Sequence, residues 1–315
     1  MELPLGFPVL PFANQRKPKA GVSIGVSRAE GEGFREVGYR PVFVAAVAAQ
    51  EREPRTTEEF NDRGIARKAK GDLDGAIADY DRAISLNPTY ALAYYNRGIA
   101  RGDRGDLDGA IADYTKAVEL NPDYVSAYYN RGNVRRERGE LDEAVADYTK
   151  AIALNPSDAR AYNNRGSARA GRGDREGALA DYARAVELNP AYPDAYNNRG
   201  SVLFGKGDAD GALADYTKAI ALDPDFALAY FNRGLARHAE GDDDGAVADF
   251  TKAVALSPTY AHAHAGLGLA LMSKGKDGEA EREFKKAFGL DPGLKPKIEK
   301  WAEEIRRKRN AAPKP

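Results

Sequence analysis

The sequence predicts an all-α protein, a solenoid of antiparallel helix pairs, and two observations support that fold class. First, the segment Ala91 to Tyr124 returns 34 residues later as 125–158, and the same spacing recurs along the chain. Second, each copy holds two runs with small or apolar residues at three- and four-residue steps, which is the helical period. A fixed period of this length is typical of stacked helix–turn–helix repeats.

Seven copies follow one another without insertion. They are residues 57–90, 91–124, 125–158, 159–192, 193–226, 227–260 and 261–294. Residues 1–56 share nothing with them and hold six prolines and six glycines, which predicts a disordered leader. Its apolar stretch 41–49 looks like a secretory cleavage site ending near residues 48–49. The alternatives are a short apolar run in a disordered tail or a mis-assigned start codon, and these favour a cytoplasmic location.

The second copy illustrates how each repeat is expected to fold. Gly105 closes the first helix, because glycine tolerates the left-handed conformation of a C-terminal cap. Asp106 follows in a position suited to cap the N-terminus of the second helix. Pro122 ends that helix, since proline disfavours the helical conformation of the residue before it. Neither helix can bury its apolar face alone, so neighbouring repeats must stack.

These residues resemble the tetratricopeptide repeat. The family's small residue at position eight matches Gly98, its alanine at position twenty matches Ala110, and its aromatic at position twenty-four matches Tyr114. The remaining matches, at positions four, twenty-seven and thirty-two, are Tyr94, Ala117 and Pro122. The resemblance covers 238 of the 315 residues. It implies a right-handed superhelical solenoid whose concave wall consists of the first helices.

Two positions depart from the family pattern. Position seven, usually leucine, is arginine in six copies: Arg63, Arg97, Arg131, Arg165, Arg199 and Arg233. Position twenty-three is acidic in every copy: Asp79, Asp113, Asp147, Asp181, Asp215, Asp249 and Glu283. We expect bidentate ion pairs between the two helices of a repeat, because arginine near a helix interface needs a partner. The alternative is an anion-binding ladder.

A last helix is predicted over residues 295–309, followed by a disordered tail over 310–315. The apolar residues Leu294, Ile298, Trp301 and Ile305 step by four, three and four, which indicates one buried stripe. We expect this stripe to cover the exposed end of the stack, as terminal elements of repeat proteins do.

The resemblance implies that ligands lie along the first helices, and position six is the most informative position there. It is asparagine in five copies: Asn96, Asn130, Asn164, Asn198 and Asn232. Such a ladder can pair with the main chain of an extended peptide, because asparagine is both a donor and an acceptor. Position five is expected to tune specificity, through Tyr95, Tyr129, Asn163, Asn197 and Phe231. The alternative is that the position-six asparagines cap or hydrogen-bond locally within each repeat.

Other function classes find little support in the sequence. Lysine plus arginine (47) nearly balances aspartate plus glutamate (48), which argues against a nucleic-acid partner. There is no cysteine, and no apolar run approaches the length of a membrane span. No catalytic, metal or cofactor motif is found, so we expect a non-enzymatic scaffold with a protein or peptide partner. Two alternatives are an exported periplasmic assembly factor with the same groove and the repeat portion of a split enzyme such as a glycosyltransferase. The oligomeric state is not predicted.

Overall fold

The computed structural model describes residues 53–311, and every regular element within that range is a helix. The predicted leader, with its candidate cleavage site near residue 48, lies outside the described residues. The first helices of the seven repeats are α2 (Thr57–Ala69), α4 (Ala91–Asp103), α6 (Val125–Glu137), α8 (Ala159–Gly171), α10 (Pro193–Gly205), α12 (Ala227–Ala239) and α14 (Ala261–Ser273). The second helices are α3 (Leu73–Leu86), α5 (Leu107–Leu120), α7 (Leu141–Leu154), α9 (Arg175–Leu188), α11 (Ala209–Leu222), α13 (Asp243–Leu256) and α15 (Asp277–Leu290).

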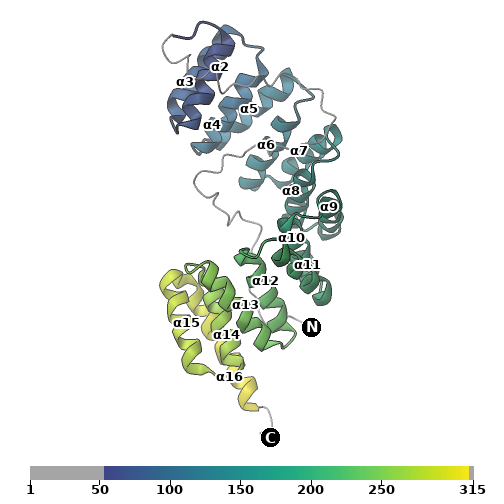
Figure 1. Cartoon of the computed structure of the whole chain (residues 1–315), viewed down its shortest axis with the longest axis vertical. Helices are drawn as coiled ribbons and strands as arrows, with labels where there is room; N and C mark the ends of the chain where they lie inside the picture. The colour runs from purple at the N-terminus through teal and green to yellow at the C-terminus, as the bar shows by residue number, and fades with distance from the viewer. Residues whose placement is uncertain (1–52, 312–315) are drawn as a thin grey trace. The chain divides into compact units, whose positions relative to one another are not determined.

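The turn inside each repeat forms as the sequence predicts. Gly105 has a φ of 88°, which only glycine adopts without strain, and it ends the first helix of the second repeat. The side chain of Asp106 then accepts a hydrogen bond from the backbone N–H of Gly109 at 2.9 Å, which caps α5. In the seventh repeat Lys276 occupies this place, and its side chain makes no cap because ammonium has no acceptor. The helix pairs can be followed in Figure 1.

The core of a repeat lies between its two helices. In the second repeat Ala110 and Ala117 have no exposed surface, and Tyr114 is 3 % exposed. Gly98 of the facing helix lies so close that an added Cβ would come within 2.9 Å of the Tyr114 ring. The small residue at position eight therefore makes room for the large aromatic residue at position twenty-four.

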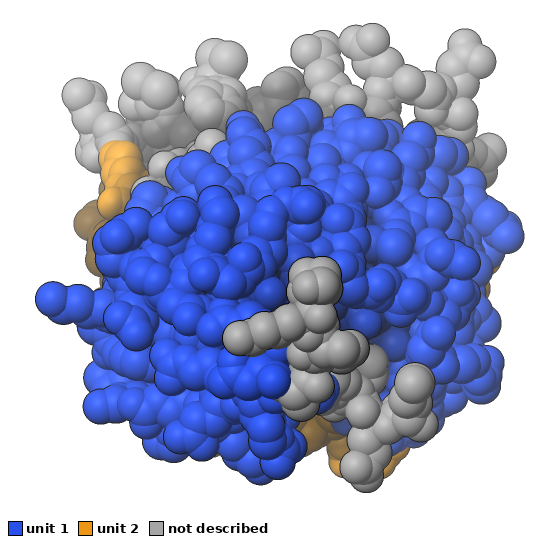
Figure 2. All heavy atoms as spheres, turned by 90° about the horizontal axis from the view of Figure 1, so that it is seen from below, with its two compact units in different colours: residues 1–12, 169–315 blue, residues 13–168 orange. Residues whose placement is uncertain are grey.

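The described chain forms two compact units, coloured separately in Figure 2, and the boundary falls within α8. Unit 2 holds the described residues 53–168 and unit 1 holds the described residues 169–311. In both units the first helices of successive repeats contact one another, as α4 does α6 and α12 does α14. The second helices of successive repeats make at most marginal contact. The first helices therefore form one face of each unit, its inner face.

A final helix covers the last repeat, as predicted. A short 3-10 turn, η2 (Pro292–Leu294), leads into α16 (Lys295–Ala311), which extends two residues beyond the predicted end and packs against α14. Ile298 is fully buried in a cluster formed with the sixth and seventh repeats. Trp301 and Ile305 pack against the same cluster, so the apolar stripe of α16 does cover this end of unit 1.

Candidate functional site

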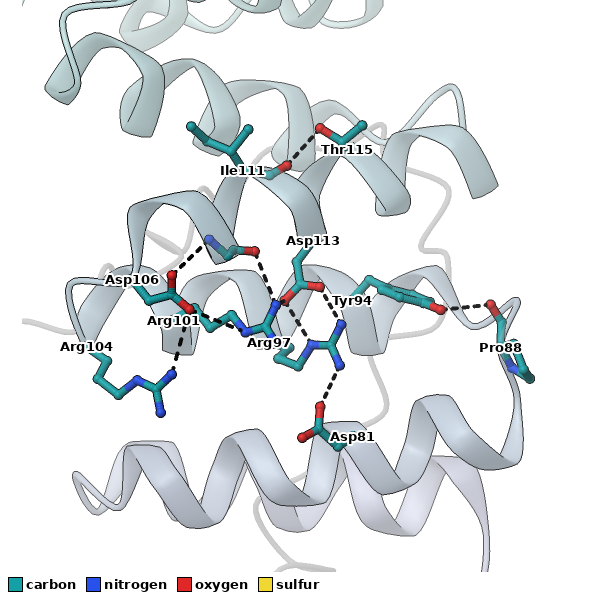
Figure 3. Close-up of polar contacts among 11 residues, drawn as sticks. Asp81, Pro88, Tyr94, Arg97, Arg101, Arg104, Asp106, Ile111, Asp113 and Thr115 are labelled. Carbon is teal, nitrogen blue, oxygen red and sulfur yellow. Dashed lines mark hydrogen bonds and ion pairs between the residues drawn. The ribbon is translucent and has the colours of Figure 1, made fainter.

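Arginine and aspartate side chains tie the two helices of a repeat together, as Figure 3 shows for the second repeat. Arg97 binds the Asp113 carboxylate in a bidentate manner, with Nε 2.9 Å from Oδ2 and Nη2 2.5 Å from Oδ1. The same carboxylate accepts from Nη1 of Arg101 at 2.9 Å. Asp113 is only 3 % exposed, so a pair of cations compensates its burial.

This arrangement recurs in both units. Bidentate pairs between positions seven and twenty-three are Arg63–Asp79, Arg97–Asp113, Arg131–Asp147, Arg199–Asp215 and Arg233–Asp249. The predicted structural ion pair is therefore confirmed in these five repeats. The hydrogen bonds that Arg63 donates to Asp79 raise the pKa of Arg63 above its ordinary value, so that guanidinium stays charged.

Two features of this network are not evident from the pairing prediction. The position-seven arginine also reaches back to the second helix of the preceding repeat, as Arg131 does to Oγ1 of Thr115 at 3.0 Å. A second arginine at position eleven contacts the position-twenty-three aspartate in five repeats, through Arg67, Arg101, Arg135, Arg169 and Arg237. The recurrence of arginine at position eleven was a sequence signal for it.

The position-six asparagines form hydrogen bonds between successive first helices. Nδ2 of Asn130 donates to the hydroxyl of Tyr95 at 3.0 Å. Nδ2 of Asn164 donates to the hydroxyl of Tyr129 at 2.9 Å. The alternative of local bonds does not describe these contacts, because each crosses from one repeat to the preceding one.

Two further asparagines follow the same rule with a carboxamide partner at position five. Asn96 donates to Oδ1 of Asn61 at 2.9 Å, and Asn232 donates to Oδ1 of Asn197 at 2.9 Å. The position-six asparagines thus hold successive repeats in register. Asn198 accepts from Nδ2 of Asn197 at 3.4 Å within its own helix.

Burial separates the ten predicted site residues into two groups. Five are half-buried and keep surface for a ligand: Tyr95, Tyr129, Asn130, Asn164 and Asn198. Five are buried and have little surface to offer: Asn96, Asn163, Asn197, Phe231 and Asn232. Phe231, for example, is 1 % exposed and contacts the rings of Phe250 and Tyr260. A direct contact of the buried five with a ligand stays a prediction.

Position nine determines whether the buried tyrosine at position twenty-four finds a hydrogen-bond partner. The Tyr148 hydroxyl donates to Oδ1 of Asn133 at 2.7 Å, and in the fifth repeat the Tyr216 hydroxyl is 3.3 Å from Oγ of Ser201. In the first repeat position nine is Ile65, and the hydroxyl of Tyr80 is one of the buried atoms without a hydrogen-bond partner among the described residues. The sixth repeat avoids the problem, because it has phenylalanine at position twenty-four and leucine at position nine.

The histidine at position four of the seventh repeat is packed in the core. His264 is 3 % exposed, and its Nε2 lies 3.1 Å from the carbonyl oxygen of Pro258. The Tyr94 hydroxyl makes the equivalent contact with Pro88 in the second repeat. Nδ1 of His264 lies 2.6 Å from Glu283. Burial opposes ionisation of Glu283, but hydrogen bonds from Lys286 and His264 hold its pKa below the ordinary value.

Two searches over the described part of the chain were negative. No group of three or more histidine, aspartate or glutamate side chains there could hold a metal ion. No helix among residues 53–311 combines the length and the apolarity needed to cross a membrane.

Comparison with known families agrees with this geometry. The family model described as TPR repeat matches residues 64–103, 101–135, 132–173, 168–207, 200–241 and 236–275, and a second, described as Tetratricopeptide repeat, matches residues 261–294. The chain is a tetratricopeptide repeat protein. The predicted fold class, an all-α solenoid of helix pairs, is thereby confirmed together with its C-terminal helix. Tetratricopeptide repeats are typically non-enzymatic scaffolds for protein interaction.

Solved structures of this family share the fold. A tetratricopeptide repeat protein from Parabacteroides merdae is 22 % identical with a TM-score of 0.63, over 79 % of this chain and 98 % of that one. The APC/C hetero-tetramer Cut9–Hcn1 is 18 % identical with a TM-score of 0.63, over 84 % and 52 %. A crystal structure of MamA is 33 % identical over 51 % of this chain and 94 % of its own, with a TM-score of 0.48. A search of curated proteins found no match.

Proposed function

We propose that this tetratricopeptide repeat protein is a non-enzymatic scaffold that binds an extended peptide or protein segment along its first helices. The observation that carries the proposal is the row of half-buried tyrosine and asparagine side chains on the inner face of unit 2. Tyr95 with Asn130, and Tyr129 with Asn164, present aromatic surface beside carboxamides on three successive first helices. Aromatic residues are enriched in the energetically important parts of protein interfaces.

The hydrogen bonds between repeats leave part of the Asn130 carboxamide available. In Asn130 one N–H of Nδ2 is used by Tyr95, and Oδ1 accepts no hydrogen bond from any described residue. That oxygen and the second N–H form a donor–acceptor pair, which is what an extended main chain requires. Asn164 is more fully engaged, since Nδ2 contacts Tyr129 and Asn133, and Oδ1 accepts from Asn163 at 3.1 Å. We therefore expect Asn130 to contribute more to binding than Asn164.

The experiment begins with capture of a partner by the full chain and reduction of that partner to a binding peptide. The triple variant Asn130→Ala, Asn164→Ala and Asn198→Ala is then compared with a control altered once in each of the same three repeats. The control replaces exposed position-twenty-six residues of the second helices: Lys150→Ala, Arg184→Ala and Lys218→Ala. We expect at least a ten-fold loss of peptide affinity in the asparagine variant, at roughly 1 kcal/mol per lost hydrogen bond. The control should bind as the wild type does.

A second variant separates binding from stability. Asn130→Asp keeps an acceptor for the Tyr95 hydroxyl and removes both N–H donors, and position six already holds Asp62 in the first repeat. If this variant loses affinity but keeps the helical content and the unfolding midpoint, the ligand accepts a hydrogen bond from Nδ2 of Asn130. Affinity unchanged by the triple alanine variant, with the fold intact, would refute the ladder.

A further inference from the structure

The C-terminal helix does more than cover the end of unit 1, because it also forms one side of an open cavity. This cavity has a volume of about 330 Å³. His238 and Ala239 contribute one wall from the end of α12, and Trp301 and Ile305 contribute the other from α16. Ser273, the last residue of α14, lies between them. Since α12 and α14 are first helices, the cavity lies at the inner face of unit 1, whereas the row of tyrosine and asparagine side chains that carries the proposed function lies on unit 2.

One wall of the cavity carries an oriented imidazole. Nδ1 of His238 makes a short hydrogen bond with Oδ1 of Asp243, the first residue of α13. A carboxylate can only accept, so Nδ1 carries the proton, and Nε2 of the neutral ring is an acceptor. Nε2 has no hydrogen-bond partner within residues 53–311, although the His238 side chain is only 10 % exposed. The wall therefore offers one fixed acceptor to a ligand.

The charged residues around the cavity do not favour an ion. Asp243 and Glu304 line it together with Lys308 and Arg309, so the formal charges cancel. Three of the five N–H groups of Arg309 are also engaged with residues that do not line the cavity, because Arg309 binds both oxygens of Asp277 at 2.7 and 2.8 Å and donates to the carbonyl of Met272 at 2.9 Å. A neutral ligand fits this balance better than an ammonium or a carboxylate would.

The volume of the cavity limits the size of the ligand. At about 330 Å³ the cavity is at the lower end of the range for ligand sites, which suits one large side chain better than an entire cofactor. The indole of Trp301 and the side chain of Ile305 supply apolar wall against which a flat ring can pack. The opposite wall requires a hydrogen-bond donor at the end of that ring.

We propose that this cavity binds an aromatic side chain that carries one donor, tyrosine above all, from the protein segment held by the first helices. The phenol ring packs against Trp301 and Ile305, and its hydroxyl donates to Nε2 of His238. The cavity is thus a separate contact point, on unit 1, for the protein partner of the proposed function. Buried tyrosines usually place their hydroxyl on such a partner.

Trp301 is the chain's sole tryptophan, so its fluorescence reports on the cavity directly. The probes are p-cresol, which is the tyrosine side chain, and p-xylene, which replaces the hydroxyl with a methyl group. Trp301 emission is excited where neither p-cresol nor tyrosine absorbs. We expect p-cresol to change the emission saturably in the full-length wild type. In His238→Phe the affinity for p-cresol relative to p-xylene should fall about ten-fold, because the bound hydroxyl loses its acceptor.

Two further variants make the test decisive. His262→Phe alters a half-buried histidine of α14 that does not line the cavity, and it should keep the wild-type ratio of affinities. Ala239→Phe fills the cavity from α12 and should abolish the response to both probes. An unsaturable response in the wild type would overturn the proposal. So would an equal ratio in wild type and His238→Phe, or an undiminished response in Ala239→Phe.

The two proposals fail separately in this design. The triple asparagine variant should bind p-cresol as the wild type does, since none of its substitutions lies at the cavity. Loss of peptide binding in that variant with p-cresol binding retained supports both proposals. Retained peptide binding in it would refute the ladder alone, whereas absent p-cresol binding in the wild type would refute the cavity alone.

Discussion

Neutralising one aspartate of the arginine network tests whether the network, and not the apolar core alone, holds a repeat together. In the third repeat Asp147 accepts from Arg131 at 2.9 and 2.6 Å and from Arg135 at 2.7 Å. Arg131 is 9 % exposed, so Asp147→Asn leaves a buried guanidinium without its counter-charge. Breaking such a pair costs about 3–5 kcal/mol.

The fifth repeat provides an internal comparison. Among residues 53–311, Asp215 accepts only from Arg199, because Leu203 replaces the position-eleven arginine. Asp215→Asn therefore loses one charged hydrogen bond fewer, a difference of about 1.5–3 kcal/mol. Part of this difference is offset, because Nε of Arg135 is already buried without a hydrogen bond in the wild type. That unpaired donor reduces the net stabilisation that Arg135 contributes. We expect Asp215→Asn to cost about 1–2 kcal/mol less than Asp147→Asn.

Amide hydrogen exchange is the appropriate assay, because repeat arrays open locally and not in one transition. A loss of 3–5 kcal/mol lowers protection in α6 and α7 by about two to three and a half orders of magnitude, at 1.4 kcal/mol per factor of ten. Arg135→Leu copies the fifth repeat and should change protection by no more than about ten-fold. A loss below 1 kcal/mol in Asp147→Asn, or equal losses at Asp147 and Asp215, would refute the reasoning.

Three further predictions concern packing, pH and the C-terminal helix. Gly132→Ala places a Cβ 2.9 Å from the Tyr148 ring and should lower the free energy of unfolding in urea by about 1–3 kcal/mol. In the control Gly102→Ala the new Cβ would meet nothing nearer than 3.8 Å, so this variant should be more stable than the wild type by up to about 1 kcal/mol. Burial raises the pKa of Tyr148 and Tyr216, so the unfolded state releases their protons at a lower pH than the folded state does. The free energy of unfolding should therefore fall as pH rises above about 10, which an alkaline unfolding titration followed by tyrosinate absorbance measures. An unchanged free energy of unfolding up to pH 12 would contradict this prediction. Removing residues 295–315 uncovers the apolar cluster at the end of unit 1, so amide-exchange protection should fall more in α14 and α15 than in α10. Equal protection in the full and shortened chains would contradict the capping role.

The repeat period was enough to predict the helix pairs, because spacing alone fixes where each helix begins and ends. Gly105 and Asp106 predicted the turn correctly, since a left-handed glycine and an N-cap aspartate are local devices that need no tertiary context. The pairing of Arg97 with Asp113 was also predictable. A buried arginine must find a carboxylate, and the family geometry placed one on the facing helix.

The direction of the position-six asparagines could not be predicted in the same way. Sequence establishes that Asn130 lies on a first helix, but its partner Tyr95 belongs to the preceding repeat. Which of the two repeats is within reach depends on how successive helix pairs rotate against each other, and no local pattern encodes that rotation. The cavity was missed for a related reason: His238 and Trp301 are distant in sequence and meet only because α16 packs on α14.

The pairing of positions nine and twenty-four links the core of a repeat to its inner face. Position twenty-four is tyrosine in the first five repeats and phenylalanine in the last two, and position nine changes from isoleucine through asparagine and serine to leucine. A buried hydroxyl without a partner costs about 1–3 kcal/mol, so the polar choices at Asn133 and Ser201 relieve a cost that Tyr80 still bears. Replacing Asn133 to alter a ligand preference would therefore also remove the acceptor of the Tyr148 hydroxyl, which would keep only its hydrogen bond with the donor Arg136. The double variant Asn133→Leu with Tyr148→Phe avoids this, because it copies the sixth repeat.

We expect the double variant to be more stable than Asn133→Leu alone by about 1–3 kcal/mol in urea unfolding. If the two variants were equally stable, polarity on the inner face would be independent of the core, and position nine would be free to vary with the ligand.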